Sequence, residues 1–134
     1  MTAPAPFEPE PTPETAPYWD GAREGRLRIQ LCDACGRHYF YPRSHCRYCA
    51  SPDVRWVDAS GGARLESYVI NGRPLPGYEP VVALVQLDEG PRMMTNIVDV
   101  APDPANLPLD LRLRVTFRPR GGTALPMFRP EAAP

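Results

Sequence analysis

The sequence has 134 residues, of which 43% are hydrophobic, and a formal net charge of −1 at pH 7. This size allows one small domain, or one small domain joined to a short segment that a bound metal ion stabilises. The 15 basic residues are all arginine and 16 acidic residues balance them, so the chain lacks the basic surplus with which proteins wrap nucleic acids. Its 19 prolines argue against long helices.

Cellular location is predicted from two absences in the sequence. No stretch approaches the roughly 18 apolar residues of a membrane span, and the N-terminus has neither the basic nor the apolar region of a signal peptide. We therefore predict a cytoplasmic protein without a membrane partner. Because thiols stay reduced inside the cell, its cysteines are expected to bind metal and not to form disulfides.

Composition divides the chain into five segments. They are an arm (1–14), a short helix (15–25), a metal ribbon (26–58), a barrel (59–130) and a tail (131–134). The arm alternates proline, alanine and acid, which predicts a flexible extended segment; the alternative is an arm that orders only against a partner.

The short helix has recognisable start and stop signals. Thr15 is a plausible N-cap, Pro17 sits in the first turn, and Gly25 is a fitting stop. So short a helix is unstable alone, so its aromatic residues must pack on the same domain or on another chain.

Two cysteine pairs organise the sequence. The four cysteines form pairs with the same two-residue gap, separated by ten residues: Cys32 and Cys35, then Cys46 and Cys49. Such pairs can close a tetrahedral four-sulfur site around one structural zinc ion. Iron in the same cage is the alternative. Because four thiols fill the site, His38 and His45 are expected to be surface or supporting groups.

The remaining sequence predicts a mainly β protein. Residues 81–87 are almost continuously apolar, which predicts a strand buried on both faces. Five short strands with hairpin turns and one long loop (71–80) favour a five-stranded, partly open barrel of the OB type. In the ribbon the predicted strands are 26–31 and 54–57, and residues 37–43 are predicted as a strand followed by a turn. In the barrel the predicted strands are 63–70, 81–87, 92–100, 110–117 and 124–128.

Several stretches resemble one family in order and spacing. They are Tyr18-Trp19, Gly25-Arg26-Leu27, residues 30–36, Pro42-Arg43, the second cysteine pair, Trp56, Ser60-Gly61, residues 85–96 and residues 125–130. The sequence is similar to the rubredoxin-like zinc ribbon plus OB-fold family associated with acyl-CoA enzymes, catalogued as domain of unknown function 35. It departs from the family pattern at Arg47, Ala50, Ala63 and Asp110, where proline or glycine is usual, so local turn geometry is in question there.

The resemblance implies an accessory subunit of a thiolase-fold enzyme acting on acyl-CoA thioesters. It favours an aldolase of the lipid-transfer-protein-like type that cleaves steroid side chains, with a thiolase or acyltransferase complex as the alternative. The sequence itself has no nucleophile elbow, phosphate loop or helix-borne histidine pair, so we expect no independent catalysis and no catalytic residue.

Partner contacts are predicted from aromatic and basic side chains. Exposed aromatics of the helix and ribbon are expected to form a hydrophobic face for the partner: Tyr18, Trp19, Tyr39, Phe40, Tyr41 and Tyr48. Arg73 and Tyr78 of the long loop are expected to reach the partner's active-site entrance, and Arg73 or Arg92 to meet a CoA phosphate.

Single-stranded nucleic-acid binding is the alternative of another class. Residues 38–41 would serve as a stacking platform, next to arginines 112, 114, 118 and 120. The neutral net charge opposes this interpretation.

Overall fold

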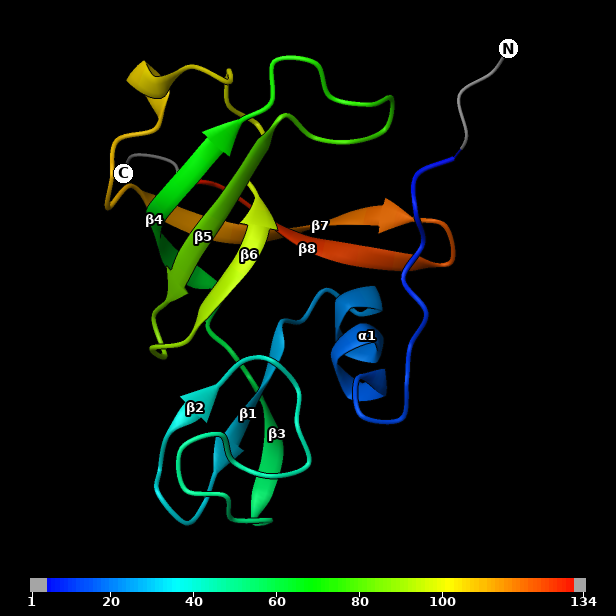
Figure 1. Cartoon of the computed structure of the whole chain (residues 1–134), viewed down its shortest axis with the longest axis vertical. Coiled ribbons are helices and arrows are strands. Elements are labelled where there is room, and N and C mark those ends of the chain that lie inside the picture. Colours follow the sequence, from blue (N-terminus) through cyan, green and yellow to red (C-terminus); the bar gives the residue numbers. More distant parts are fainter. Residues whose placement is uncertain (1–4, 132–134) are drawn as a thin grey trace.

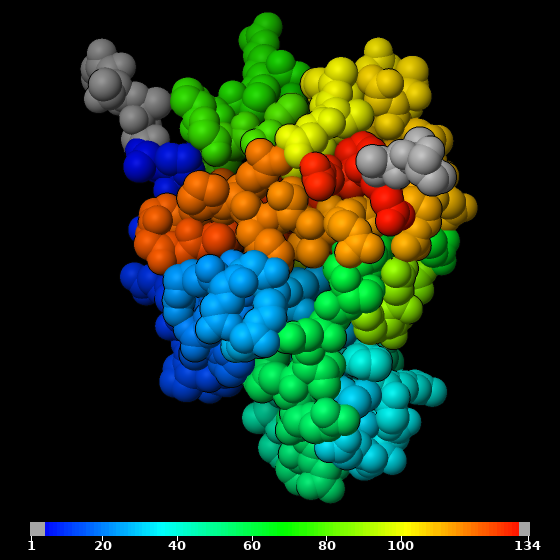
Figure 2. All heavy atoms as spheres, turned by 180° about the vertical axis from the view of Figure 1, so that it is seen from behind, coloured from blue at the N-terminus to red at the C-terminus, as the bar shows by residue number. Residues whose placement is uncertain are grey.

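The computed structural model describes residues 5–131 as a short helix, a three-stranded ribbon and a five-stranded barrel (Figure 1). The cysteine-bearing end of the ribbon projects beyond the barrel (Figure 2). This architecture confirms the mainly β fold predicted from the sequence. The elements are α1 (Ala16–Arg23), β1 (Arg28–Cys32), β2 (His38–Tyr39), β3 (Val54–Asp58), β4 (Gly62–Ile70), β5 (Val81–Leu87), β6 (Arg92–Asn96), the 3₁₀ helix η1 (Pro104–Asn106), β7 (Arg112–Arg120) and β8 (Thr123–Pro130).

All strand pairs within the two sheets are antiparallel. The ribbon has the order β2-β1-β3, and the barrel has the order β6-β5-β4-β7-β8. The outer strands β6 and β8 come together at a parallel bridge between Ile97 and Phe128. The barrel is therefore nearly closed, with a seam between β6 and β8.

Helix α1 ends where its glycine signal predicts. The Arg26 N–H donates to the Gly21 carbonyl at 2.8 Å around Gly25, whose φ of 76° suits a residue without a Cβ. Thr15 lies at the N-cap, but its side chain makes no cap bond and accepts from the Thr12 N–H at 2.9 Å. The predicted boundaries are correct to within two residues.

One apolar core joins the helix, the base of the ribbon and the barrel. Tyr18 of α1 and Leu27 and Ile29 at the start of the ribbon are buried in the same cluster as the inward side chains of β4, β5, β7 and β8. A second, smaller cluster surrounds the cysteines. The ribbon therefore has a base that shares the barrel core and a tip that does not.

The prediction that residues 81–87 are buried on both faces is wrong. Their side chains alternate, so that Val81 and Val85 face the core while Leu84 faces outward and is 38% exposed. Leu84 lies opposite Met94 of β6, which is 69% exposed. The apolar pattern is real, but its outward residue Leu84 is left exposed by the described chain.

Among the other strand boundaries, the ends of β6 and β7 differ most from the sequence prediction. Strand β6 stops at Asn96 instead of continuing to residue 100, and Asp99 has a left-handed φ of 58° that is incompatible with a regular strand. Strand β7 continues to Arg120, beyond the predicted end at residue 117.

Two positions where the family commonly has glycine keep a glycine-like backbone. Ala50 has φ of 62° and Asp110 has φ of 65°. The left-handed backbone conformation is sterically unfavourable for residues other than glycine, and asparagine and aspartate tolerate it better than alanine. The turn geometry that was in question is thus retained at both positions.

The described part of the N-terminal arm lies extended against the barrel. The Phe7 N–H donates to the Tyr78 hydroxyl at 2.8 Å, and Arg120 donates to the Phe7 carbonyl at 3.0 Å. The Gly122 N–H donates to the Glu8 carboxylate at 2.8 Å. The arm thereby links the β4–β5 loop to the β7–β8 turn (Figure 1).

Candidate metal centre and docking groove

The two cysteine knuckles have the same local construction. In the first, the Gly36 N–H donates to the Cys32 carbonyl at 2.8 Å; in the second, the Ala50 N–H donates to the Cys46 carbonyl at 2.9 Å. Gly36 and Ala50 both have positive φ, of 75° and 62°. Each turn directs its two sulfurs toward the other knuckle.

The four sulfurs have the separations of a single tetrahedral site. The Sγ atoms of Cys32 and Cys49 are 3.6 Å apart, those of Cys35 and Cys46 are 3.7 Å apart, and all four lie within 4.8 Å of one another. A Zn–S bond of about 2.3 Å implies sulfur separations of about 3.8 Å, whereas a disulfide requires about 2.05 Å. The donor set therefore fits one zinc ion, and neither histidine belongs to it.

Proton loss from the clustered thiols is uneven. Burial raises the pKa of Cys46, but donation from the N–H groups of Cys49 and Tyr48 and from neighbouring thiols outweighs it and lowers the pKa to about 7. For Cys49, donation from the Ser51 N–H lowers the pKa, but burial and the other thiols outweigh it and raise the pKa to about 12. Because metal binding requires thiolates, loading this site releases protons.

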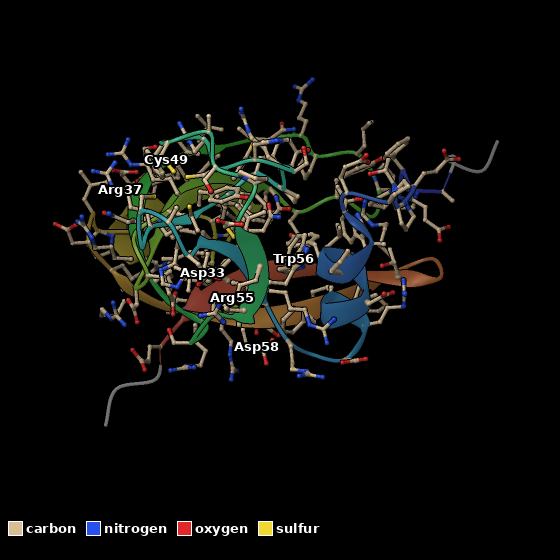
Figure 3. The ribbon with its side chains drawn as sticks, turned by 90° about the horizontal axis from the view of Figure 1, so that it is seen from below. Asp33, Arg37, Cys49, Arg55, Trp56 and Asp58 are labelled. Atoms are coloured by element: carbon tan, nitrogen blue, oxygen red, sulfur yellow. The ribbon has the colours of Figure 1, made fainter. Side chains whose placement is uncertain are left out.

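Arginines surround the centre. Arg37 and Arg47 lie 4.9 and 5.3 Å from the centroid of the Tyr48 ring. Arg55 of β3 pairs with Asp33, the residue after β1, at 3.0 Å (Figure 3). A divalent ion with four thiolates carries a formal charge of about −2, which nearby guanidinium groups stabilise.

A groove of about 510 Å³ lies at the seam between β6 and β8. One wall is aromatic: the Tyr18 ring centroid lies 4.8 Å from that of Trp19 and 5.6 Å from that of Phe40. Burial, reinforced by Tyr41, raises the pKa of the Tyr18 hydroxyl above its ordinary value, so the wall is uncharged at neutral pH. The lining residues are Tyr18, Trp19, Phe40, Tyr41, Leu84, Arg92, Met93, Met94, Thr95, Asn96, Leu125 and Pro126.

Two further hollows adjoin this groove. One of about 560 Å³ lies between the arm and the opposite side of the aromatic wall, and includes Phe7. The other, of about 450 Å³, lies under the β4–β5 loop and includes Leu75 and Tyr78. Together the three hollows form a band of exposed apolar surface from the arm to the loop.

The predicted contact residues divide into three groups. Tyr18, Trp19, Phe40, Tyr41 and Arg92 line the groove, and Tyr78 lines the adjoining hollow. Arg73 lies on the loop outside both hollows. The exposure expected of Tyr18 and Tyr39 is wrong, since they are 8% and 1% exposed. The Tyr39 hydroxyl donates to the Arg43 carbonyl at 3.1 Å. Tyr48 is exposed as expected but lies outside the groove.

The sequence interpretation missed the strand residues of the groove. Leu84, Met94, Leu125 and Pro126 line it from β5, β6 and β8. For Leu84 the signal was the apolar run of residues 81–87, which was interpreted as burial within the chain. Arg92 is less free than expected, because its Nε lies 2.9 Å from the Glu66 carboxylate.

The fold and the cysteine site define a zinc ribbon followed by an OB-fold barrel. Family models match both parts: the rubredoxin-like zinc ribbon domain of ChsH2 matches residues 19–55, and the C-terminal OB-fold domain of ChsH2 matches residues 56–118. The chain belongs to this DUF35 family, and its cofactor is one structural zinc. No helix within residues 5–131 is long and apolar enough to cross a membrane.

Solved structures agree with this assignment. The chain is similar to a chain of the Ltp2-ChsH2(DUF35) aldolase, with 33% identity, a TM-score of 0.80, and coverage of 92% of this chain and 98% of that one. A DUF35 protein from Sulfolobus solfataricus, 16% identical with a TM-score of 0.62, shares the fold over 89% of this chain and 86% of its own.

Curated relatives include larger proteins. The probable enoyl-CoA hydratase alpha subunit of Thermomonospora curvata is 36% identical over 87% of this chain and 37% of its own length. The 3-oxo-4,17-pregnadiene-20-carboxyl-CoA hydratase alpha subunit of Mycobacterium tuberculosis is 33% identical over 83% of this chain and 36% of its own. The chain thus spans just over a third of these two relatives. A DUF35 domain-containing scaffold protein of Pyrococcus furiosus is 33% identical over 64% of this chain and 66% of its own length.

Proposed function

We propose that this protein is a non-catalytic accessory subunit that binds and supports a thiolase-fold acyl-CoA enzyme in the cytoplasm. The favoured partner is a lipid-transfer-protein-like retro-aldolase that cleaves a steroid-type side-chain CoA thioester. The observation that carries the proposal is the similarity to a chain of the Ltp2-ChsH2(DUF35) aldolase across nearly the whole of both chains.

The zinc centre has a structural role in this proposal. Its proposed ligands are Cys32, Cys35, Cys46 and Cys49, and four thiolates leave no open coordination position for substrate. The ion therefore supplies folding free energy to the ribbon and not Lewis-acid catalysis.

The apolar band is the proposed docking surface. Aromatic residues and methionine are enriched at protein interfaces, and here Tyr41 and Met94 are 67% and 69% exposed. Contiguous apolar surface of this kind marks interaction sites on monomeric proteins. The proposed anchors are Trp19, Phe40 and Tyr41.

The β4–β5 loop is the proposed approach to the partner's active site. Tyr78 is held by the arm through its hydroxyl and lies 5.2 Å from the Arg120 guanidinium, so the loop has a fixed base. Arg73 is exposed and makes no ion pair with another described residue. It is the proposed contact for a CoA phosphate, which a guanidinium recognises in a forked geometry.

A thiolase or acyltransferase complex is the second candidate within the same class. The relatives that are named scaffold proteins support a non-catalytic role with either partner. Nucleic-acid binding is disfavoured because the strand arginines proposed for it are engaged. Arg112 pairs with Asp88 at 2.9 Å, and Arg118 pairs with Asp99.

Co-expression with a candidate thiolase-like protein from the same genome tests the proposal. We expect one co-purifying complex, retained at high salt, that cleaves a steroid side-chain CoA thioester while neither protein alone does so. A complex that catalyses thiolysis or acyl transfer instead would select the second candidate. Absence of any complex, together with a mobility shift of single-stranded oligonucleotide, would reject the proposal.

A further inference from the structure

The backbone of β6 carries unused hydrogen-bonding groups at the barrel seam. The Leu87 N–H donates to the Pro91 carbonyl, and the Ile97 N–H donates to the Val81 carbonyl at 3.3 Å. In an antiparallel ladder every second residue of a strand bonds to its partner strand. The two bonds above, together with the register, show that Met93 and Thr95 are the β6 residues that bond to β5. The intervening residues, Arg92, Met94 and Asn96, turn their N–H groups to the seam. There β6 has no second strand as a partner within the described residues, and no main-chain acceptor outside the strand ladders bonds to these groups.

The opposite edge, β8, does not complete this ladder. The Val98 N–H donates to the Phe128 carbonyl at 2.8 Å, which closes the far end of the seam. Two residues earlier in β8, Pro126 faces the seam but has no N–H to donate. Its carbonyl accepts from the Thr95 hydroxyl at 3.0 Å. Among the described residues, no strand pairs with the seam edge of β6 along the groove, which Leu125 and Pro126 of β8 line from the other side.

The groove fits an extended polypeptide better than a small molecule. Donors that recur at every second residue match the backbone of an added strand, and the aromatic wall accepts its alternate apolar side chains. Arg92 is the one charged lining residue within the described chain, and Glu66 already pairs with it. The occupant is therefore expected to be uncharged where it enters the groove.

The chain's own arm does not meet these requirements. Four prolines within residues 5–14 remove the N–H groups that a ladder needs. The arm also lies on the other side of the aromatic wall, fixed by Phe7 and Glu8 to the β4–β5 loop and the β7–β8 turn.

We propose that the partner enzyme inserts an extended apolar segment into this groove and pairs it with the edge of β6, adding a strand to the barrel. This inference rests on the proposed function, because it assigns the contact through which the thiolase-fold enzyme is held. Edge-strand addition supplies affinity through the main chain and specificity through the pockets for side chains.

Hydrogen exchange resolved at single amides tests the proposal in the wild-type complex. In the free chain the amides of Arg92, Met94 and Asn96 should exchange fast, while those of Met93 and Thr95 are protected by β5. In the complex we expect exchange at the first three to slow by at least about tenfold, and the other two to serve as the internal reference.

A pair of variants at one position separates the backbone from the side chain. Met94→Pro removes a seam-facing N–H without removing a β5 bond, and Met94→Ala keeps that N–H while removing the same side chain. We expect Met94→Pro to weaken the complex at least about tenfold more than Met94→Ala does, because one main-chain bond is lost and the ring obstructs pairing.

The outcomes separate the two proposals. A complex that forms without new protection of the three amides, or that binds both variants equally, overturns strand addition and leaves the accessory role standing. Failure of the wild-type chain to bind any thiolase-fold partner rejects the proposed function itself. Protection that grows with concentration of the free chain, or with added oligonucleotide, would assign the groove to a second copy or to nucleic acid and overturn the inference.

Discussion

The ribbon tip and the barrel are stabilised by different means. Around the cysteines the buried cluster contains three residues, Cys32, Tyr39 and Cys46, whereas the core that includes the barrel contains fourteen. Three buried side chains cannot offset the conformational entropy of ordering two knuckles and their connecting turn. The tip therefore depends on a metal, and the barrel depends on apolar burial. Their separate cores allow each to be disrupted alone.

Removal of zinc is expected to have the largest effect. Binding at structural zinc sites contributes about 10–16 kcal/mol, far more than three buried residues supply, so chelation or Cys46→Ser should unfold the tip completely. The barrel should stay folded because its core does not include the cysteines. Amide exchange measured along the chain should show lost protection in the second knuckle and retained protection in β4 and β5.

A matched control for this prediction replaces the histidines next to the cysteines. His38→Ala and His45→Ala should each retain one zinc per chain, since neither ring belongs to the sulfur cluster. Zinc loss in either variant would contradict the four-cysteine assignment. A purified wild-type protein with a red colour would contradict zinc in favour of iron.

Truncation of a barrel core side chain is the next effect in size. Phe128 is fully buried at the closing bridge, and Phe128→Ala should lower the free energy of unfolding by about 3–5 kcal/mol. Zinc stoichiometry of the folded protein should not change, because the tip has its own core. Urea unfolding followed at the Trp residues, together with zinc analysis, measures both.

The exposed residue Leu109 provides the control for that substitution. Its side chain is 65% exposed, so Leu109→Ala should change the unfolding free energy by less than about 0.5 kcal/mol. Loss of zinc from folded Phe128→Ala protein would show that the two cores are coupled and would contradict the separation argued above.

The sequence predicted those features whose information is local. A two-residue gap between cysteines specifies a knuckle turn within six residues, and the structure brings the four sulfurs together. Apolar patterns and turn residues likewise predicted four of the five barrel strands to within a few residues of their ends. Hydrophobic periodicity and turn residues are sufficient for such elements.

Features that depend on distant segments were beyond this kind of inference. The groove exists because β6 and β8 separate before residue 96, and its wall is completed by α1 and by Phe40 of the ribbon. Tyr39 and Phe40 are neighbours in sequence, yet Tyr39 packs in the ribbon core and Phe40 faces the groove. The sequence showed that the outer face of β5 is apolar. It could not show whether that face is covered by another part of the same chain or by a partner protein, because both require the same apolar residues.

The smallest effect is expected from a substitution at the connection between the ribbon and the barrel, around residues 59–62. The turn after β5 holds this connection: the Asp88 N–H donates to the Gly62 carbonyl at 3.0 Å, and Glu89 accepts from the Ser60 N–H at 2.8 Å. Arg112 donates to both oxygens of Asp88, at 2.9 and 3.1 Å, and this pairing lowers the pKa of Asp88.

Asp88→Asn should therefore lower stability in a pH-dependent way. Because the folded pKa of Asp88 is depressed, its contribution is fully present above the unfolded value of about 3.9 and is lost as the pH falls through the folded pKa. The side chain is 40% exposed, so solvent screening limits the contribution to about 1 kcal/mol or less. Urea unfolding at pH 7 and near pH 2 should show a difference between wild type and variant that disappears in acid, while Glu14→Gln in the exposed arm should show none. A difference that persists undiminished in acid would mean that Asp88 stabilises the connection through its hydrogen-bonding shape and not through its charge.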